Sequence, residues 1–397
     1  MAKEFLGPYA TAKVLEGVLE ALPLVRPNFL QTAFASGFDT RNTKTVNFDK
    51  EFAIRNVIAE FVHPKSDVSL IELGDFGHTE AAFAYSKEGW ADDDFETLDQ
   101  RQLGQAFGQV DIAANQALRL VKKATIAEQR FENLFENTWA QIAMFGSYVA
   151  AGEKHPTMKY DFGRSVSTKA SDLSKDLLSS TNLTTTAVTT PWGSTALPVI
   201  PTSSGYTAGQ KAWTKANIDA KTATPVQDIV KMYQTARRQG GGTKSIIMQT
   251  SAYTQFNYDV ELNYKDAAST TISSILSAQR DILPQAKEVD GLTLVRYWTF
   301  ANGVSIPIYT YDAKYNNRDT GVEVLYIPDG WVINVPDPSF GLKLYGRIQH
   351  RKAQFQAMPR FINRWVDDKS GDEEFEVHTS FLIGHKKIDS VIALKVN

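Results

Sequence analysis

The stretch QVDIAANQALRLVKKATIAEQRFENLFENTWAQIAMFGSYVAA, residues 109–151, contains no proline and a single glycine, Gly146. Most of its residues are strong helix formers, and apolar or small side chains recur at steps of three and four. The recurring positions are Val110, Ala114, Ala117, Val121, Ala124, Ala127, Phe131, Leu134, Thr138, Ile142, Phe145 and Val149. This spacing places them on one face, so the sequence predicts a single amphipathic helix over residues 109–151.

The predicted helix has a start signal and a stop signal. Five acidic residues lie between positions 92 and 99, and negative charge stabilises the positive end of a helix dipole. Gly152 and Pro156 follow the last apolar position. Unbroken, the helix would be about 65 Å long at 1.5 Å per residue. Such a helix is either a coiled coil or a spine lying on a sheet, and its Ala-rich stripe favours the spine.

The residues before the helix are predicted to be two extended parts. Residues 1–43 are expected to be an arm, because prolines bracket a short helix at 10–22 and the later apolar residues show no regular spacing. The arm must pack on another surface, either its own domain or a neighbouring copy. Residues 44–92 are expected to form a long two-stranded β excursion. A hairpin of this length is marginal alone, which implies a partner surface.

The residues after the helix begin with a segment of different composition. In residues 165–207, 19 of 43 residues are Ser or Thr, and three prolines interrupt any regular element. We therefore expect an insertion or long loop over residues 165–215, with at most a short helix at 171–180.

The last two parts are predicted from their periodicity. Residues 216–340 are expected to be a compact α/β region, in which helices cover a small sheet. Its expected elements are helices at 225–239 and 251–258 and strands at 245–248, 292–295, 306–311 and 322–327. Residues 341–397 return to β structure, and a turn at 384–387 is expected to fold a strand at 375–383 toward a final strand at 388–396.

The composition excludes several classes of protein. The 397 residues carry a formal net charge of -3, which argues against a surface that grips nucleic acid everywhere. There is no cysteine, so disulfides, thiolate metal sites and cysteine nucleophiles are excluded, which suits a reducing cytoplasm. No apolar stretch approaches the roughly 20 residues that span a bilayer, and the first five residues do not begin a secretion signal.

No catalytic motif is found. The six histidines have no ligand spacing, and His385, in a predicted turn, is expected to be solvated. Gly240–Gly242 follow a helix and precede a strand, the reverse of the order that aims a helix N-terminus at phosphate. The acids at 92–94 are expected to cap a helix rather than bind a cation. We therefore predict no catalytic residue, no metal and no cofactor.

The order of these parts resembles the major capsid proteins of tailed phages, and several short motifs resemble the lambda-type capsid protein E family. These motifs are residues 45–48 (TVNF), 59–64 (AEFVHP), 83–87 (FAYSK), 161–165 (DFGRS), 344–349 (LYGRIQ) and the ending 374–397. Each motif is weak alone, and their order and spacing carry the resemblance. The Ser/Thr-rich segment is longer than the family pattern.

The resemblance implies an α+β capsid fold of the Hong Kong 97 type. Its parts would be an N-terminal arm (1–43), an extended β loop (44–92), a peripheral domain with the spine helix (93–164), the insertion (165–215), an axial domain (216–340) and returning peripheral strands (341–397).

The resemblance also implies a structural function without catalysis. Copies of the chain would form hexamers and pentamers, and these would form an icosahedral head around double-stranded DNA. The expected contacts between copies are Phe29, Phe34, Phe61, Val62, Phe76, Phe83 and Tyr85, with Lys314, Tyr315 and Arg318 near the capsomer centre.

The expected partners are other copies, a portal, a decoration protein and a separate scaffolding protein, because little chain precedes the extended loop. Assembly is expected in the host cytoplasm without a membrane. Two alternatives remain open: an encapsulin-like shell of a bacterial nanocompartment, and a hydrolytic enzyme with unrecognised carboxylates.

Overall fold

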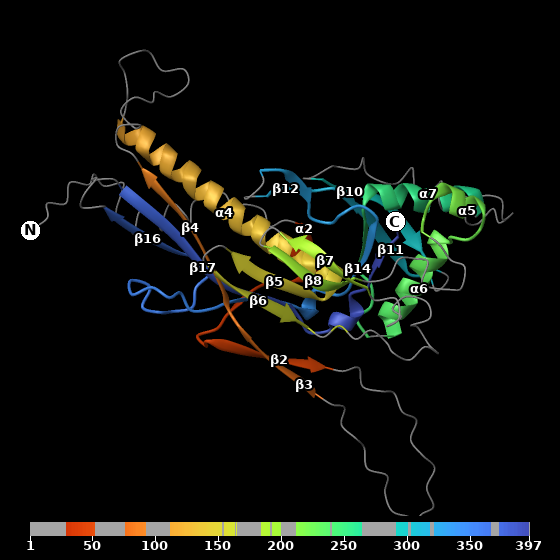
Figure 1. Ribbon diagram of the computed structural model, residues 1–397, viewed down its shortest axis with the longest axis horizontal. Helices are drawn as coiled ribbons and strands as arrows, with labels where there is room; N and C mark the ends of the chain where they lie inside the picture. The colour runs from red at the N-terminus through yellow and green to blue at the C-terminus, as the bar shows by residue number, and fades with distance from the viewer. Residues whose placement is uncertain are drawn as a thin grey trace, which may run out of the picture.

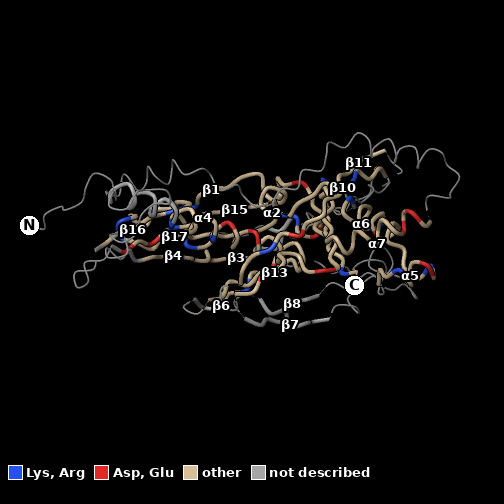
Figure 2. Tube along the Cα trace, turned by 90° about the horizontal axis from the view of Figure 1, so that it is seen from above, with Lys and Arg blue, Asp and Glu red and all other residues tan. Residues whose placement is uncertain are grey.

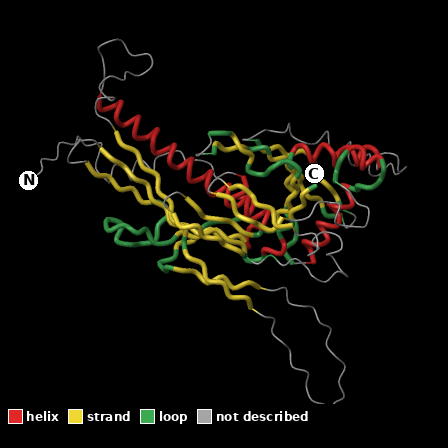
Figure 3. Tube along the Cα trace, viewed as in Figure 1, coloured by secondary structure: helices red, strands yellow, loops and turns green. Residues whose placement is uncertain are grey.

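A computed structural model describes residues 29–51, 76–92, 112–152, 155–162, 164, 184–190, 193–199, 212–238, 240–263, 291–300, 303–317, 321–366 and 373–396. The described chain is elongated, and one long helix runs obliquely over a sheet toward a second sheet (Figure 1, Figure 3). Basic and acidic residues are both spread along the trace, in keeping with the near-neutral net charge (Figure 2). No helix in this part of the chain has the length and apolar character that crossing a bilayer requires.

The long helix, α4, spans Ile112–Phe145, so the predicted end at residue 151 is wrong. Gly146 adopts a positive φ of 69°, which glycine tolerates and which ends the helix. The Arg164 guanidinium then donates hydrogen bonds to the carbonyl oxygens of Ile142, Ala143 and Met144 at 2.8–3.0 Å. The residues predicted as the last turn instead form strand β5 (Ser147–Gly152), which pairs with β6 (His155–Asp161).

The first sheet lies under α4 and contains β1 (Asp39–Thr40), β15 (Gly341–Tyr345), β17 (Glu373–His385), β16 (Phe361–Val366) and β4 (Ala84–Asp92). Strand β4 is paired with β17 along its whole length, from Ala84 opposite Phe381 to Asp92 opposite Glu373. The predicted β excursion therefore includes a strand of the chain's own sheet. Phe135 of α4 packs edge-on against Phe381, which attaches the helix to this sheet.

The second sheet has the order β10 (Leu292–Thr299), β11 (Ser305–Tyr311), β9 (Ser245–Met248), β14 (Trp331–Val335) and β18 (Ala393–Lys395). Helices α5 (Lys215–Asp219), α6 (Pro225–Arg238) and α7 (Thr250–Asn263) accompany it. The predicted helix at 225–239 and strand at 245–248 are confirmed, while α7 is longer than predicted. The prediction that the last strand folds back on β17 is wrong, because β18 pairs with β14 after the short helix η4 (Ile388–Ser390).

Besides the β5–β6 pair, the described residues form three two-stranded ribbons outside the two large sheets. Strands β2 (Thr45–Glu51) and β3 (Phe76–Ala82) form the ribbon that projects farthest (Figure 1). Strands β7 (Thr184–Thr190) and β8 (Gly193–Val199) form a second, so part of the predicted Ser/Thr-rich insertion or long loop is a β ribbon. Strands β12 (Lys314–Asn316) and β13 (Glu323–Leu325) form the third. The helix expected at 171–180 lies outside the described residues.

The two sheets share one hydrophobic core. A continuous cluster of buried apolar side chains includes Leu382 of β17, Trp139 of α4 and Ile247 of β9. Several turns of α4 contribute side chains to the cluster. The helix therefore packs against both sheets and connects them.

Candidate functional site

The best-defined polar site is a buried joint centred on Glu136, in the C-terminal third of α4. The Glu136 side chain is fully buried and accepts three hydrogen bonds. The backbone N–H groups of Leu30 and Gln31 donate to it at 2.8 and 3.2 Å, and the Tyr311 hydroxyl donates at 2.6 Å. Leu30 and Gln31 belong to the arm helix α2 (Phe29–Phe34), and Tyr311 ends β11. One carboxylate therefore connects the arm, the long helix and the second sheet.

The Glu136 carboxylate satisfies the free N–H groups that begin α2. The first N–H groups of a helix have no partner within the helix, and a negative charge there is favourable. Burial raises the pKa of Glu136 to about 7, and the repulsive charge of Glu132 adds to this rise. The hydrogen bonds from Tyr311, Leu30 and Gln31 act in the opposite direction. The carboxyl group thus titrates close to neutral pH.

One turn earlier, Glu132 extends the joint toward the first sheet. The Gln31 amide donates to the Glu132 carboxylate at 2.8 Å, and the Lys343 ammonium of β15 donates to the Gln31 side-chain oxygen at 2.8 Å. The same ammonium lies 4.2 Å from the centre of the Phe135 ring. Burial lowers the pKa of Lys343 to about 8. The arm helix is therefore tied to both the long helix and β15.

A second attachment lies another turn earlier. The Arg360 guanidinium, just before β16, donates to both carboxylate oxygens of Glu128 at 3.0 and 3.1 Å and to Glu132 at 3.4 Å. Its carbon atom lies 4.7 Å from the Phe131 ring centre. Only 14% of the Arg360 side chain is exposed, so this pair is less screened than a surface ion pair.

Glu128, Glu132 and Glu136 thus form an acidic stripe on one side of α4, and neighbouring members share partners: Glu128 and Glu132 bind Arg360, and Glu132 and Glu136 bind α2. Their four-residue spacing was visible in the sequence and was a signal for the stripe. Residues four apart on a helix lie on one face. The arrangement has the chemistry of a structural joint: buried charges paired with cations, amide groups and a phenol.

Some predicted contact residues lie on or near the projecting ribbon. Phe61, Val62 and Arg318 lie outside the described residues. Phe76 begins β3 at the far end of the ribbon. Phe83 lies against Gly346, whose missing side chain makes room for the ring. The Tyr85 hydroxyl lies 2.6 Å from Nδ1 of His378 in the chain's own sheet.

The other predicted contacts pack within the chain. Phe34 is fully buried and stacks on Trp139, with ring centres 5.6 Å apart, so its own chain already covers it. The prediction that Phe34 contacts a neighbour is therefore corrected. The Phe29 ring lies 5.3 Å from Tyr309.

The ribbon predicted to lie near a capsomer centre makes contacts within the chain. Tyr315 of β12 packs on Tyr326, and Lys314 pairs with Glu323 of β13. Figure 1 places β12 nearer to α4 than α5 and α7, which occupy the end of the molecule away from β16.

The expectation of a solvated His385 is wrong. The ring is only 3% exposed, at the end of β17, and burial together with the nearby charge of Arg164 lowers its pKa to about 3. The position of His385 in a turn predicted that its side chain is exposed. The side chain instead lies near Arg164, which caps the end of α4.

Comparisons with known proteins agree with this architecture. The sequence model of the family described as phage major capsid protein E matches residues 200–396. No curated protein sequence matches the chain. A structure described as a prophage capsid protein of Escherichia coli CFT073 has a TM-score of 0.60 at 14% identity, covering 98% of this chain and 99% of that one.

Two further solved structures are more distant. A phage-related protein of Bordetella bronchiseptica RB50 has a TM-score of 0.45 at 11% identity, with 96% of both chains covered. The SrpI encapsulin of Synechococcus elongatus PCC 7942 has a TM-score of 0.38 at 8% identity, with 94% of this chain and 90% of that one covered. The family match over residues 200–396 and the capsid fold along nearly all of the chain together support a structural major capsid protein of the lambda type.

Proposed function

We propose that copies of this chain assemble into hexamers and pentamers, which close an icosahedral head around phage double-stranded DNA. The observation that carries the proposal is the β2–β3 ribbon. It projects from the body as two strands with no third strand beside them among the described elements (Figure 1). An isolated two-stranded ribbon is marginal in water, so a neighbouring copy is the surface that stabilises it.

Further apolar surface supports contacts between copies. Phe38 and Phe355 are 63% and 53% exposed, which is unusual for phenylalanine. A capsid subunit touches several neighbours, so each interface can be weak. An interface with millimolar affinity contributes about 4 kcal/mol, and several such contacts acting together hold a shell while assembly remains reversible.

The proposal extends to partners and to place of assembly. We expect a separate scaffolding protein to guide closure, a portal to occupy one vertex, and a decoration protein to bind the finished surface. Assembly would take place in the host cytoplasm, and the chain would carry out no catalytic step. Co-expression with each candidate partner, followed by purification of particles, tests each association separately.

The test of the main proposal removes the ribbon without disturbing its base. Phe48 and Thr79 are opposite each other in the ladder, so replacing residues 49–78 by Asn-Gly closes the shortened ribbon with a two-residue turn. Electron microscopy of the full chain, expressed with its scaffolding protein, should show closed shells. The shortened chain should form none, while its circular dichroism and unfolding temperature stay those of the full chain.

A matched control changes a turn elsewhere. Thr190 and Gly193 are opposite each other in β7–β8, so Pro191→Asn with Trp192→Gly inserts the same turn without touching the projecting ribbon. This variant should still assemble. Normal shells from the shortened chain would refute the role of the ribbon, and failure of the full chain to assemble under any condition would refute the proposed function.

A further inference from the structure

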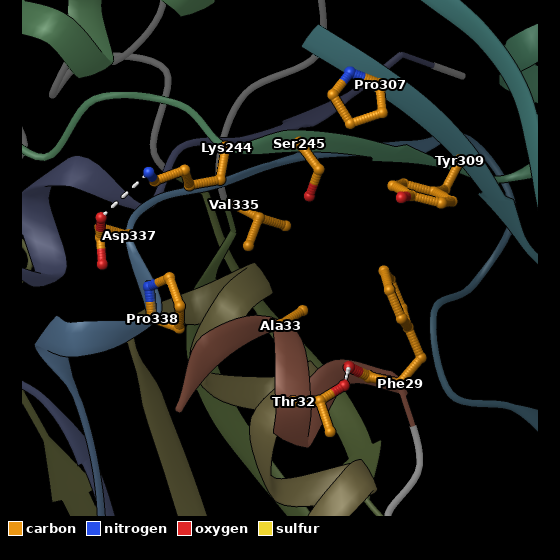
Figure 4. A pocket seen from close by; sticks show the side chains of 10 residues that line it. All are labelled: Phe29, Thr32, Ala33, Lys244, Ser245, Pro307, Tyr309, Val335, Asp337 and Pro338. Carbon is orange, nitrogen blue, oxygen red and sulfur yellow. Dashed lines mark hydrogen bonds and ion pairs between the residues drawn. The ribbon is translucent and has the colours of Figure 1, made fainter. Parts of the chain in front are cut away.

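An apolar groove of about 450 Å³ opens between α2 and the central strands β11, β9 and β14 of the second sheet (Figure 4). Ala33 of α2 and Pro307 of β11 lie on opposite sides of it, and the Phe29 and Tyr309 rings, whose centres are 5.3 Å apart, close one end. Val335, at the end of β14, lies between the two sides. A cavity of this size holds a few side chains, and we call it the arm groove.

Three polar side chains of the arm groove, those of Thr32, Lys244 and Asp337, are bonded within the chain. The Thr32 hydroxyl donates to the carbonyl oxygen of Phe29 at 2.8 Å. The Lys244 ammonium and the Asp337 carboxylate pair at 3.4 Å, and Asp337 also accepts from the Ser339 N–H at 3.0 Å. Burial raises the pKa of the Tyr309 phenol, as expected for a ring in weakly polar surroundings. The groove therefore favours an occupant that is mainly apolar.

The chain itself brings an apolar segment to this place. Phe29, which forms part of the wall, is the first residue of α2, and the residues before it are Pro23-Leu24-Val25-Arg26-Pro27-Asn28. A residue before proline avoids helical backbone, which favours an extended conformation at Arg26. Four residues separate Val25 from Phe29, a reach of at most about 14 Å.

We propose that Leu24 and Val25 of the same chain occupy the arm groove. They are the apolar side chains nearest to Phe29 on its N-terminal side. A short tether gives them a millimolar effective concentration at the groove, which a segment from another molecule must exceed to compete. Docking at this point determines where residues 1–23 leave the body, beside β11 and α2. The inference concerns a contact within one chain and goes beyond the proposed assembly.

Because the chain has no cysteine, engineered thiols give an unambiguous test. The variant Val25→Cys with Pro307→Cys places one thiol in the segment and one on the opposite wall of the groove. A short bismaleimide should convert it to an internally cross-linked monomer. The control, Val25→Cys with Lys215→Cys, has its second thiol on α5 at the far end of the second sheet (Figure 1). We expect about tenfold less cross-linking in the control, as follows from tethered proximity.

A third variant tests the groove itself. Adding Thr32→Trp to the first pair fills the groove with an indole ring and should lower the internal cross-linking severalfold. If Pro307→Cys prevents folding, Lys244→Cys supplies a thiol on the same rim. Labelling with a fluorescent maleimide verifies that both thiols react.

Two results would overturn the inference. A cross-linked dimer as the main product would show that a neighbour's segment enters the groove, and reactive thiols without cross-linking would show that the segment lies elsewhere. Neither result bears on shell formation, which microscopy of the full chain decides independently. Shells without the internal cross-link would remove only this inference.

Discussion

Glu136 is the residue at which the arm, the long helix and the second sheet meet. A buried carboxylate is unfavourable unless its oxygens are hydrogen-bonded, and here the three donors come from two other elements. Glutamate at this position therefore makes docking of α2 sensitive to protonation, since the charged and neutral forms differ in their cost of burial.

The variant Glu136→Gln should remove a pH dependence from the stability of the chain. Burial raises the pKa of Glu136 from 4.5 to about 7, so the folded chain holds this proton more tightly than the unfolded chain. The stabilising contribution is complete below pH 4.5 and is lost as the pH rises through 7. Between these limits the wild type should lose about 3 kcal/mol relative to Glu136→Gln. Urea unfolding of both chains at several pH values measures the difference.

The matched control for this measurement is Glu323→Gln, which changes an exposed ion pair with Lys314, since 66% of the Glu323 side chain is exposed. Its stability relative to the wild type should be nearly constant over the same pH range. Parallel curves for the wild type and Glu136→Gln would contradict the prediction, because they would mean that Glu136 titrates alike in both states.

Arg164 is the second residue whose role is local and specific. Its buried guanidinium donates to three carbonyl groups at the end of α4, where carbonyls have no partner within the helix. Arg164→Met keeps the length of the side chain but removes the donor from the Ala143 and Met144 carbonyls, while the Ile142 carbonyl still accepts from the Gly146 N–H at 2.8 Å. We expect a loss of about 3 kcal/mol in the free energy of unfolding.

The comparison for Arg164→Met is Arg41→Met, because Arg41 is 58% exposed and pairs with the exposed Asp39. This variant should cost about 1 kcal/mol or less. Thermal unfolding of both variants shows which loses more stability. Equal losses would contradict a stabilising role of Arg164 as the helix cap.

At the scale of elements, the long helix was predictable because its apolar period extends over many turns. Its end was not predictable, because the apolar residues continue past Gly146 as strand β5, and the cap comes from Arg164, distant in sequence. Strand β4 was placed in the projecting excursion for a similar reason. Alternation indicates a strand but does not identify the strand with which it pairs. The partner of β4 is β17, which lies about 300 residues later in the sequence.

The joint was missed although its residues are visible in the sequence. Glu128, Glu132 and Glu136 are spaced like neighbours on one helix face, but acidic residues on a helix usually face solvent. Their partners come from the arm, from β11 and from the loop before β16, and no sequence period connects those elements. The second half of the chain was predicted more accurately, since compact helices and strands at 225–248 have strong local signals.

The docking of α2 should be a major contribution to stability. Phe34 is fully buried and stacks on Trp139 of α4, so Phe34→Ala leaves a cavity between the two helices. We expect a loss of about 4 kcal/mol. Phe38→Ala is the matched control in the same arm, because Phe38 is 63% exposed, and it should cost about 0.5 kcal/mol or less. Equal unfolding temperatures for the two variants would contradict the packing described here.

At the scale of the whole molecule, stability is unevenly distributed. The sheets and α4 share a continuous core, whereas the β2–β3 ribbon contributes only a few residues near its base, such as Ala81 and Val46. Backbone hydrogen bonds that few apolar contacts support open readily, while those in the core open only with global unfolding. A subunit with this distribution presents a rigid body and an extension whose order depends on its surroundings.

Amide hydrogen exchange should therefore report assembly at the ribbon and not in the core. In the free chain, amides of residues 45–51 and 76–82 should exchange rapidly, while those of β17 should be protected. In purified shells the ribbon amides should slow by about tenfold or more, since a neighbour that covers the ribbon must be displaced before the strands separate. The amides of β17 serve as the internal reference, because their burial does not depend on a neighbour. Equal ribbon exchange in free chain and shells would mean that the ribbon projects into solvent in the shell, and another surface would then have to join the copies.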